Sequence, residues 1–165
     1  MGKNLEIWVF GDHRNHLRDR STLQVLGQAR ALSGDKGRVT VILLGHQVEG
    51  MAREYIAYGA QRVLLVDHPQ LAWYRVDLFT MLLSELIREH QPEIFLIGAS
   101  EFGKELASRI AKRLGVGLCA DAISLEWDEK VERLSASSPA FGGTFLARIA
   151  WSTHQPSMAT VTPGG

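Results

Sequence analysis

The sequence predicts an α/β fold with three layers (α/β/α), in which helices cover both faces of a mainly parallel, doubly wound sheet. Short apolar runs rich in β-branched residues alternate with longer stretches of helical period, which is the order of right-handed βαβ units. The run at 39–44 is apolar apart from one threonine, as in strands covered on both faces. Past about residue 122 only short extended runs remain, and these predict an antiparallel, β-rich C-terminal edge.

Each element can be placed by its period and by the residues that end it. The expected order is strand 5–10, a helix from Ser21 or Thr22 to Gly34, strand 39–44, helix 47–58 ended by Gly59, strand 62–66, helix 73–90 broken by Gln91-Pro92, strand 93–97 and a helix closed by Gly115. Ser and Thr favour the position before a helix, and Gly favours the position after it, because Gly adopts left-handed backbone angles without strain. Apolar residues at 73–90 recur every three or four positions, so one side of this helix is expected to face the sheet.

The last third of the chain is expected to add strands at one edge of the sheet. Its extended runs are 123–127, 131–136, 145–151 and 158–161, and residues 128–130 have the composition of a hairpin connection. No linker, internal repeat or low-complexity segment separates this part from the rest. Residues 1–165 are therefore predicted to form a single, Rossmann-like domain.

Composition and charge exclude several classes of protein. The 165 residues carry 18 Lys and Arg against 18 Asp and Glu, and this zero net charge argues against binding to nucleic acid or to a membrane surface. The apolar runs are too short to cross a bilayer, so no membrane insertion is expected. One cysteine, Cys119, allows neither a disulfide nor a cysteine-based zinc site within the chain. Residues 1–4 lead into a strand without the apolar region of a secretion signal, and the protein is expected to be cytoplasmic.

No catalytic site stands out in the sequence. Cys119 lies in an apolar segment without a neighbouring base, so it is interpreted as a small buried hydrophobic residue. His13 and His16 are three residues apart, but the adjacent Arg14 and Arg18 would repel a metal ion, and a solvated loop is the better interpretation. No Gly-x-Ser-x-Gly sequence occurs. We expect neither an enzyme active site nor a metal site.

A small-residue loop at 98–105 is the best candidate for a nucleotide site, although the chain has neither Gly-x-Gly-x-x-Gly nor a Walker sequence. In doubly wound sheets ligands lie beyond the carboxyl ends of strands, where helix N-termini offer free N–H groups to anions. The candidate residues are Gly98, Ser100, Gly103 and Lys104. The alternative is an ordinary capped helix start, with Ser100 as the cap and Glu101 at the positive end of the helix dipole.

The segment 138–144 is the other distinctive stretch. Its proline, aromatic residue and two glycines predict a tight, exposed turn between strands. One interpretation is purely structural. The other is a surface that another chain or domain approaches closely, since glycines leave room for such an approach. The candidates for partner or interdomain contact are Pro139, Phe141, Gly142 and Gly143.

An ordered set of motifs along nearly the whole chain resembles one known family. The set comprises Ile7-Trp8-Val9-Phe10 with the following His/Arg loop, residues 22–31, Gly98-Ala99-Ser100, residues 103–109, 118–121 and 139–143, and the segment 155–161. In these residues the sequence is similar to the N-terminal domain of the electron transfer flavoprotein alpha subunit. That domain itself resembles adenine nucleotide alpha hydrolase and universal-stress proteins, but is usually empty of nucleotide.

The resemblance implies a heterodimer with an electron transfer flavoprotein beta subunit, which passes electrons from dehydrogenases to a quinone oxidoreductase or other acceptors. It also implies that FAD is held mainly by a C-terminal domain of the alpha subunit. The glycine-rich FAD motifs of that domain have no counterpart in these 165 residues. No cofactor is therefore expected on this chain alone.

Two hypotheses follow. The first is a non-catalytic scaffold and partner-binding domain of an electron transfer flavoprotein. The second is a standalone adenine-nucleotide-binding module of the universal-stress type, which would use the loop from Gly98 to Lys104. Nucleotide titration of the chain and of its Lys104→Ala variant distinguishes the two.

Overall fold

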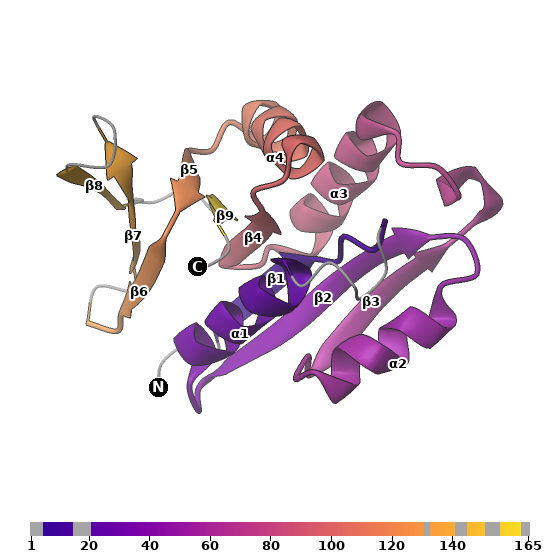
Figure 1. The fold of residues 1–165 in the computed structure, drawn as a ribbon, viewed down its shortest axis with the longest axis horizontal. Coiled ribbons are helices and arrows are strands. Elements are labelled where there is room, and N and C mark those ends of the chain that lie inside the picture. Colours follow the sequence, from indigo (N-terminus) through magenta and orange to yellow (C-terminus); the bar gives the residue numbers. More distant parts are fainter. Residues whose placement is uncertain (1–4, 15–20, 131–132, 141–144, 151–155, 163–165) are drawn as a thin grey trace.

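The computed structural model of the chain describes residues 5–14, 21–130, 133–140, 145–150 and 156–162 (Figure 1). Its elements are β1 (Leu5–Phe10), α1 (Ser21–Ser33), β2 (Gly37–Gly45), α2 (Glu49–Ala57), β3 (Arg62–Asp67), the short 3-10 helix η2 (Pro69–Leu71), α3 (Val76–His90), β4 (Ile94–Gly98), α4 (Glu101–Leu114), β5 (Leu118–Ala122), β6 (Ser124–Asp128), β7 (Arg133–Ala140), β8 (Phe145–Ala150) and β9 (Ser157–Val161). No helix among these residues is long and apolar enough to span a membrane.

Within the described residues, a six-stranded sheet has the order β3-β2-β1-β4-β9-β5, and all of its neighbouring strands run parallel. A second, three-stranded antiparallel sheet has the order β6-β7-β8. Helices cover both faces of the large sheet (Figure 1). The predicted α/β, Rossmann-like class with a mainly parallel sheet and an antiparallel addition is confirmed.

The core divides into two clusters, one on each face of the large sheet. Alternate residues of β2 belong to different clusters: Val41 and Leu43 pack with α1 residues, whereas Ile42 and Leu44 pack with residues of α3 and α4. All the apolar residues at 39–44 are fully buried. The uniformly apolar run that predicted a strand covered on both faces is thus explained by its place inside the sheet.

The expected helix ends are mostly confirmed. Gly34 and Gly115 take positive φ angles of 51° and 70°, and Gln91 ends α3 with a φ of 51° before Pro92. Two helices begin later than expected: α2 begins at Glu49, two residues later, and α3 begins at Val76, three residues later. The chain first makes η2, because the His68 side chain accepts a hydrogen bond from the Gln70 amide and so caps this short turn.

The last third departs from the expected arrangement at two strands. Residues 157–161, expected in the antiparallel edge, form the parallel strand β9 between β4 and β5. Every residue of β9 is buried, as an interior strand requires. The edge strand β5 was not expected. Its pairing with β9 shifts register between Cys119 and Ala122, and Asp121 there has a φ of 55°, so the alternation of apolar and polar residues that marks a strand is interrupted.

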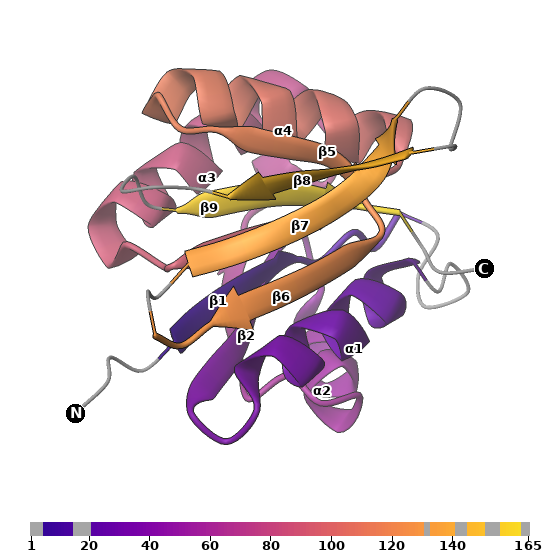
Figure 2. The same cartoon turned by 90° about the vertical axis from the view of Figure 1, so that its left-hand side faces the viewer.

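The antiparallel sheet packs on the same face of the large sheet as α1 (Figure 2). Leu134 and Ala136 of β7 join the core cluster that contains Cys119 of β5. Pro139 lies inside β7, opposite Leu146, and not in the tight turn expected at this position. Because β6 pairs with β7 only as far as Ser137, a residue without an N–H group is tolerated there. The other three contact candidates, Phe141, Gly142 and Gly143, lie outside the described residues.

Candidate functional site

The strand order reverses direction between β1 and β4, and we call the space beyond the carboxyl ends of these two strands the crevice. From β1 the chain proceeds outward through β2 and β3, and then crosses to β4 and the strands on its other side. Ligands of open α/β sheets bind at such a switch point, beyond the carboxyl ends of the strands. Two loops border it here: residues 11–14 after β1, and residues 98–100 between β4 and α4.

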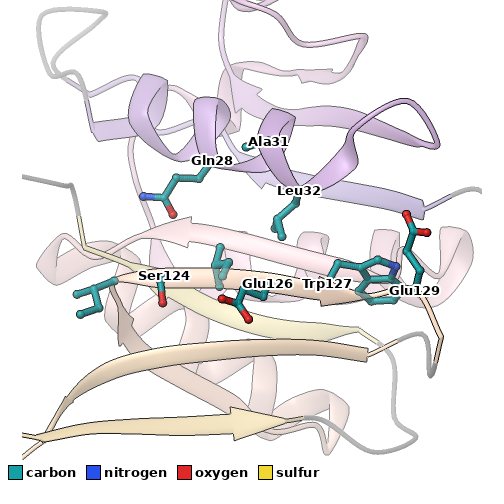
Figure 3. Close-up of a pocket in the computed structure, with 9 residues that line it drawn as sticks. Gln28, Ala31, Leu32, Ser124, Glu126, Trp127 and Glu129 are labelled. Atoms are coloured by element: carbon teal, nitrogen blue, oxygen red, sulfur yellow. The ribbon is translucent and has the colours of Figure 1, made fainter.

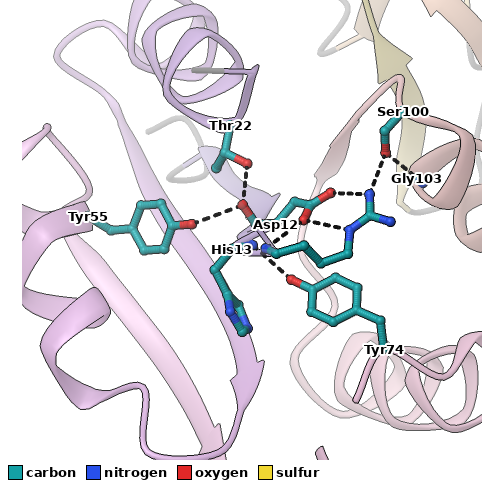
Figure 4. A network of polar contacts seen from close by, with 8 residues as sticks. Asp12, His13, Thr22, Tyr55, Tyr74, Ser100 and Gly103 are labelled. Atoms are coloured by element: carbon teal, nitrogen blue, oxygen red, sulfur yellow. Dashed lines mark hydrogen bonds and ion pairs between the residues drawn. The ribbon is translucent and has the colours of Figure 1, made fainter. Parts of the chain in front are cut away.

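An arginine of the chain itself bridges these two loops (Figure 4). The Arg14 guanidinium donates to the Asp12 carboxylate, with Nη2 2.9 Å from Oδ2 and Nε 3.2 Å from Oδ1. Its Nη2 also lies 3.3 Å from the Ser100 hydroxyl, across the crevice. Asp12 is largely buried, with 14% of its side chain exposed, whereas Arg14 is 38% exposed, so solvent still reaches the guanidinium side of the pair.

Aromatic rings enclose the same guanidinium. Arg14 Cζ lies 5.1 Å from the centre of the Tyr74 ring and 4.9 Å from that of Phe102. Both distances are within the range of cation–π attraction. The Tyr74 hydroxyl accepts a hydrogen bond of 2.8 Å from the His13 amide, which ties the loop after β1 to the segment before α3. The crevice is therefore occupied by the chain's own side chains.

The Asp12 carbonyl is held from the other side. The Thr22 hydroxyl donates to it at 3.2 Å and the Tyr55 hydroxyl at 3.5 Å (Figure 4). Burial, reinforced by the negative charge of Asp12, raises the pKa of both Tyr55 and Tyr74 above that of a free phenol. Both tyrosines thus stay protonated at neutral pH and act as neutral hydrogen-bonding groups.

The four residues of the predicted nucleotide loop lie together, but their groups have partners within the chain. The Ser100 hydroxyl caps α4 by accepting a hydrogen bond of 3.0 Å from the Gly103 amide. Lys104 points to β5, with Nζ 3.2 Å from Asp121 Oδ1. Gly98 ends β4, and its carbonyl lies so close to α4 that a Cβ on Gly103 would overlap it. The geometry is that of the capped helix start, and a nucleotide on these residues stays a prediction.

Cys119 and His13 both have structural surroundings. Cys119 is fully buried, and burial raises the pKa of its thiol, which disfavours the reactive thiolate. His13 Nε2 donates to the Leu44 carbonyl at 2.8 Å, and its ring packs edge-on against Tyr74. His16 lies outside the described residues. Among the residues described, no three His, Cys, Asp or Glu side chains gather to hold a metal ion.

Comparison with known proteins identifies the family of the chain. The family model of the electron transfer flavoprotein domain matches residues 7–165. The chain belongs to this family. The resemblance to the alpha subunit that the ordered motifs indicate is confirmed by relatives of that name.

Three relatives of the electron transfer flavoprotein domain illustrate the match. Electron transfer flavoprotein subunit alpha of Clostridium acetobutylicum is 40% identical over 96% of this chain and 47% of its own length. The subunit of the same name from Thermoanaerobacterium thermosaccharolyticum is 41% identical, over 96% and 48%. The acryloyl-CoA reductase electron transfer subunit beta of Anaerotignum propionicum is 36% identical, over 96% and 50%. The chain spans about half the length of the curated relatives it matches.

A groove beside the antiparallel sheet is the second candidate site of this electron transfer flavoprotein domain. It encloses about 670 Å³ between α1 and β6. Leu32 points from α1 toward β6, where Trp127 and Glu126 line the opposite side (Figure 3). Ile123, at the start of β6, also lines it and leaves 43% of its surface exposed. Glu129 lies at one end, 3.4 Å from Lys36 Nζ. The lining mixes apolar side chains with Gln28, Ser124 and two glutamates, and a mixed surface of this kind suits contact with another protein chain.

Sequence reasoning missed both of these features. It considered Arg14 only as a charge beside two histidines, whereas the guanidinium pairs with Asp12 two residues earlier and also contacts Ser100, Tyr74 and Phe102, which are at least 60 positions away in the chain. The one usable signal is the Asp12-His13-Arg14 sequence directly after a buried strand, since that position borders the switch point in a doubly wound fold. No local pattern indicates that β6 and α1 leave a groove.

Proposed function

We propose that this chain is a scaffold and partner-binding domain of an electron transfer flavoprotein alpha subunit, and not a catalytic or nucleotide-binding module. The observation that carries the proposal is the Arg14 bridge, because the crevice where related α/β folds take ligands holds an ion pair of the chain itself. The nucleotide-module alternative is not favoured, since every curated relative named above is an electron transfer subunit.

In the intact protein we infer a heterodimer with an electron transfer flavoprotein beta subunit. The complex carries electrons from dehydrogenases to a quinone oxidoreductase or other acceptors by way of FAD, and residues 1–165 contribute one domain to it. FAD is held mainly by a part of the alpha subunit outside these residues. The domain is an electron-carrier component and not an enzyme, and it works in the cytoplasm.

The surface that we assign to the beta subunit is the antiparallel sheet with the groove beside it. This surface carries Ile123 and the side chains of β6, and the contact candidate Pro139 belongs to the same sheet. A groove that includes Leu32 and Trp127 in its lining gives a partner side chain a place to bury, which is the usual form of an energetic anchor in an interface.

Substitution of Ile123 by aspartate tests this assignment. Ile123→Asp is expected to weaken binding to an electron transfer flavoprotein beta subunit about tenfold or more, because it places a charge in an apolar contact. The measurement is isothermal titration calorimetry with purified subunits. Met81→Asp is the matched control, since Met81 is 38% exposed on α3, on the opposite face of the sheet. If Ile123→Asp and Met81→Asp bind the beta subunit with equal affinity, the assignment of this surface to the beta subunit is wrong. If the unaltered chain does not bind the beta subunit, the proposed function is wrong.

The purified chain is expected to be colourless and to give no binding signal with AMP or ATP. The reason is the absence of flavin motifs and the occupied crevice at the switch point. Absorbance after gel filtration and nucleotide titration are the measurements. Retention of FAD, or micromolar nucleotide binding that is lost in Lys104→Ala, would contradict the scaffold function and favour the nucleotide module.

A further inference from the structure

The strand β3 ends the large sheet with an open edge. Among the strands that the structure describes, β3 pairs with β2 alone. The Gly11 amide of the loop after β1 donates to the Ile42 carbonyl, so the odd-numbered residues of β2 face β3, and the His68 amide accordingly donates to the Gly45 carbonyl. Because hydrogen-bonding direction alternates along a strand, Arg62, Leu64 and Val66 bond to β2, and the N–H and C=O groups of Val63, Leu65 and Asp67 point toward the open side.

This edge lacks the usual protection against pairing with another strand. Natural edge strands carry lysines, prolines or bulges, whereas the four central residues of β3, 63–66, are all Val or Leu. Charged residues stand only at its two ends, and both are held by the chain itself. Arg62 Nη2 donates to Glu6 Oε1 at 2.9 Å, and the Asp67 carboxylate accepts from the Gln47 amide at 2.8 Å.

Exposed apolar side chains accompany the open edge. Leu65 on β3 is 37% exposed, and Ile56 and Tyr58, at the end of the adjoining α2, are 52% and 57% exposed. Figure 1 shows α2 beside β3 at this margin of the sheet. Main-chain groups and apolar side chains together make a surface suited to strand addition.

We propose that β3 pairs with β3 of a second copy of this chain, antiparallel about a two-fold axis, so that the two large sheets become continuous. With the axis at Leu65, the outward groups of Leu65 face their own counterparts, and those of Val63 face Asp67 of the second copy. This direction brings the Arg62 end of one strand beside the Asp67 end of the other, so the charges at the ends are complementary. A chain with zero net charge also has no overall repulsion from its copy.

The pairing is compatible with partner binding and does not depend on it. β3 and the antiparallel sheet lie toward opposite ends of the long axis of the molecule (Figure 1). Each copy in the dimer therefore keeps the groove between α1 and β6 open. Self-association through β3 can hold or fail independently of the function proposed above.

Sedimentation velocity over a range of protein concentrations tests the pairing. The unaltered chain is expected to form dimers, and Leu65→Lys is expected to raise the dimer dissociation constant about tenfold or more, because a lysine on an edge strand opposes further pairing. Met81→Lys is the matched control, since Met81 is exposed to a similar extent (38% against 37%) but lies on α3. It is expected to leave the dissociation constant unchanged.

A second variant separates loss of pairing from loss of folding. Leu65→Pro removes an outward N–H that bonds to nothing within the sheet, so the fold is expected to persist while the dimer dissociates. Circular dichroism checks the fold, and amide exchange at Val63 and Leu65 of the unaltered chain should slow as the protein concentration rises. A chain that stays monomeric, a dimer unaffected in folded Leu65→Lys and Leu65→Pro variants, or edge amides protected only by a beta subunit would each overturn the proposal.

Discussion

Replacement of Gly103 by alanine is expected to destabilise the chain by about 3 kcal/mol, toward the upper end of the cost of overpacking a close contact. A Cβ at this position would lie 2.1 Å from the Gly98 carbonyl oxygen and 3.0 Å from Ile97 Cγ2. The first of these atoms belongs to the backbone of β4, so the clash cannot be relieved by turning a side chain. The first turn of α4 must move away from the sheet, and the Ser100 cap, which accepts the Gly103 amide, is disturbed with it.

Urea unfolding followed by circular dichroism measures this effect, with Gly27→Ala as the control. Gly27 lies on the exposed side of α1, and a Cβ there has no neighbour within 4 Å. Alanine is expected to stabilise the chain at that position by about 0.5–1 kcal/mol through its higher helix propensity. The expected changes in the free energy of unfolding therefore have opposite signs, because α4 approaches β4 closely at Gly103 and nothing lies near Gly27. A Gly103→Ala variant as stable as the original chain would show that α4 and β4 are not in this contact.

The close approach at Gly103 also shows what sequence could predict at the candidate site. The small residues at 98–103 indicated a strand that passes directly into a helix, and Ser100 indicated its cap; both are confirmed. A glycine at 103 is compatible with a phosphate loop and equally with tight packing. The structure decides for tight packing as the reason for this glycine, because an added Cβ would lie only 2.1 Å from the Gly98 carbonyl oxygen.

The parallel part of the fold was predictable because its signals are local. The buried run at 39–44 and the helical period expected at 73–90 each lie within one segment; the structure has strand β2 over the first, and helix α3 forms from Val76 to His90 within the second. The direction and neighbours of β9 were not predictable, since Ser157–Val161 pairs with β4, which is about 60 residues earlier in the chain. A five-residue run gives the presence of a strand but not its partner, and the partner decides whether the strand is parallel.

Replacement of Glu6 by alanine is expected to destabilise the chain by about 2 kcal/mol, after allowance for the partial exposure of its partners. Glu6 is 17% exposed and joins three strands at their amino ends. Its Oε1 accepts from the Thr40 hydroxyl at 2.6 Å and from Arg62 Nη2 at 2.9 Å, and its Oε2 accepts from Arg38 Nε at 2.7 Å. Without the carboxylate, two guanidinium groups and a hydroxyl lose their acceptor beside the same sheet.

Glu105→Ala is the matched control, because Glu105 also pairs with an arginine but lies 53% exposed on α4, with Arg109 four residues further along. Exposed pairs of this spacing contribute only about 0.3–0.5 kcal/mol. Salt is expected to reduce the small effect of Glu105→Ala further and to leave most of the effect of Glu6→Ala, since a partly buried network is less screened than an exposed pair. Urea unfolding at low and high ionic strength measures both. Equal losses for the two variants would mean that Glu6 acts as an ordinary surface charge and that β1, β2 and β3 are held together by packing and backbone hydrogen bonds alone.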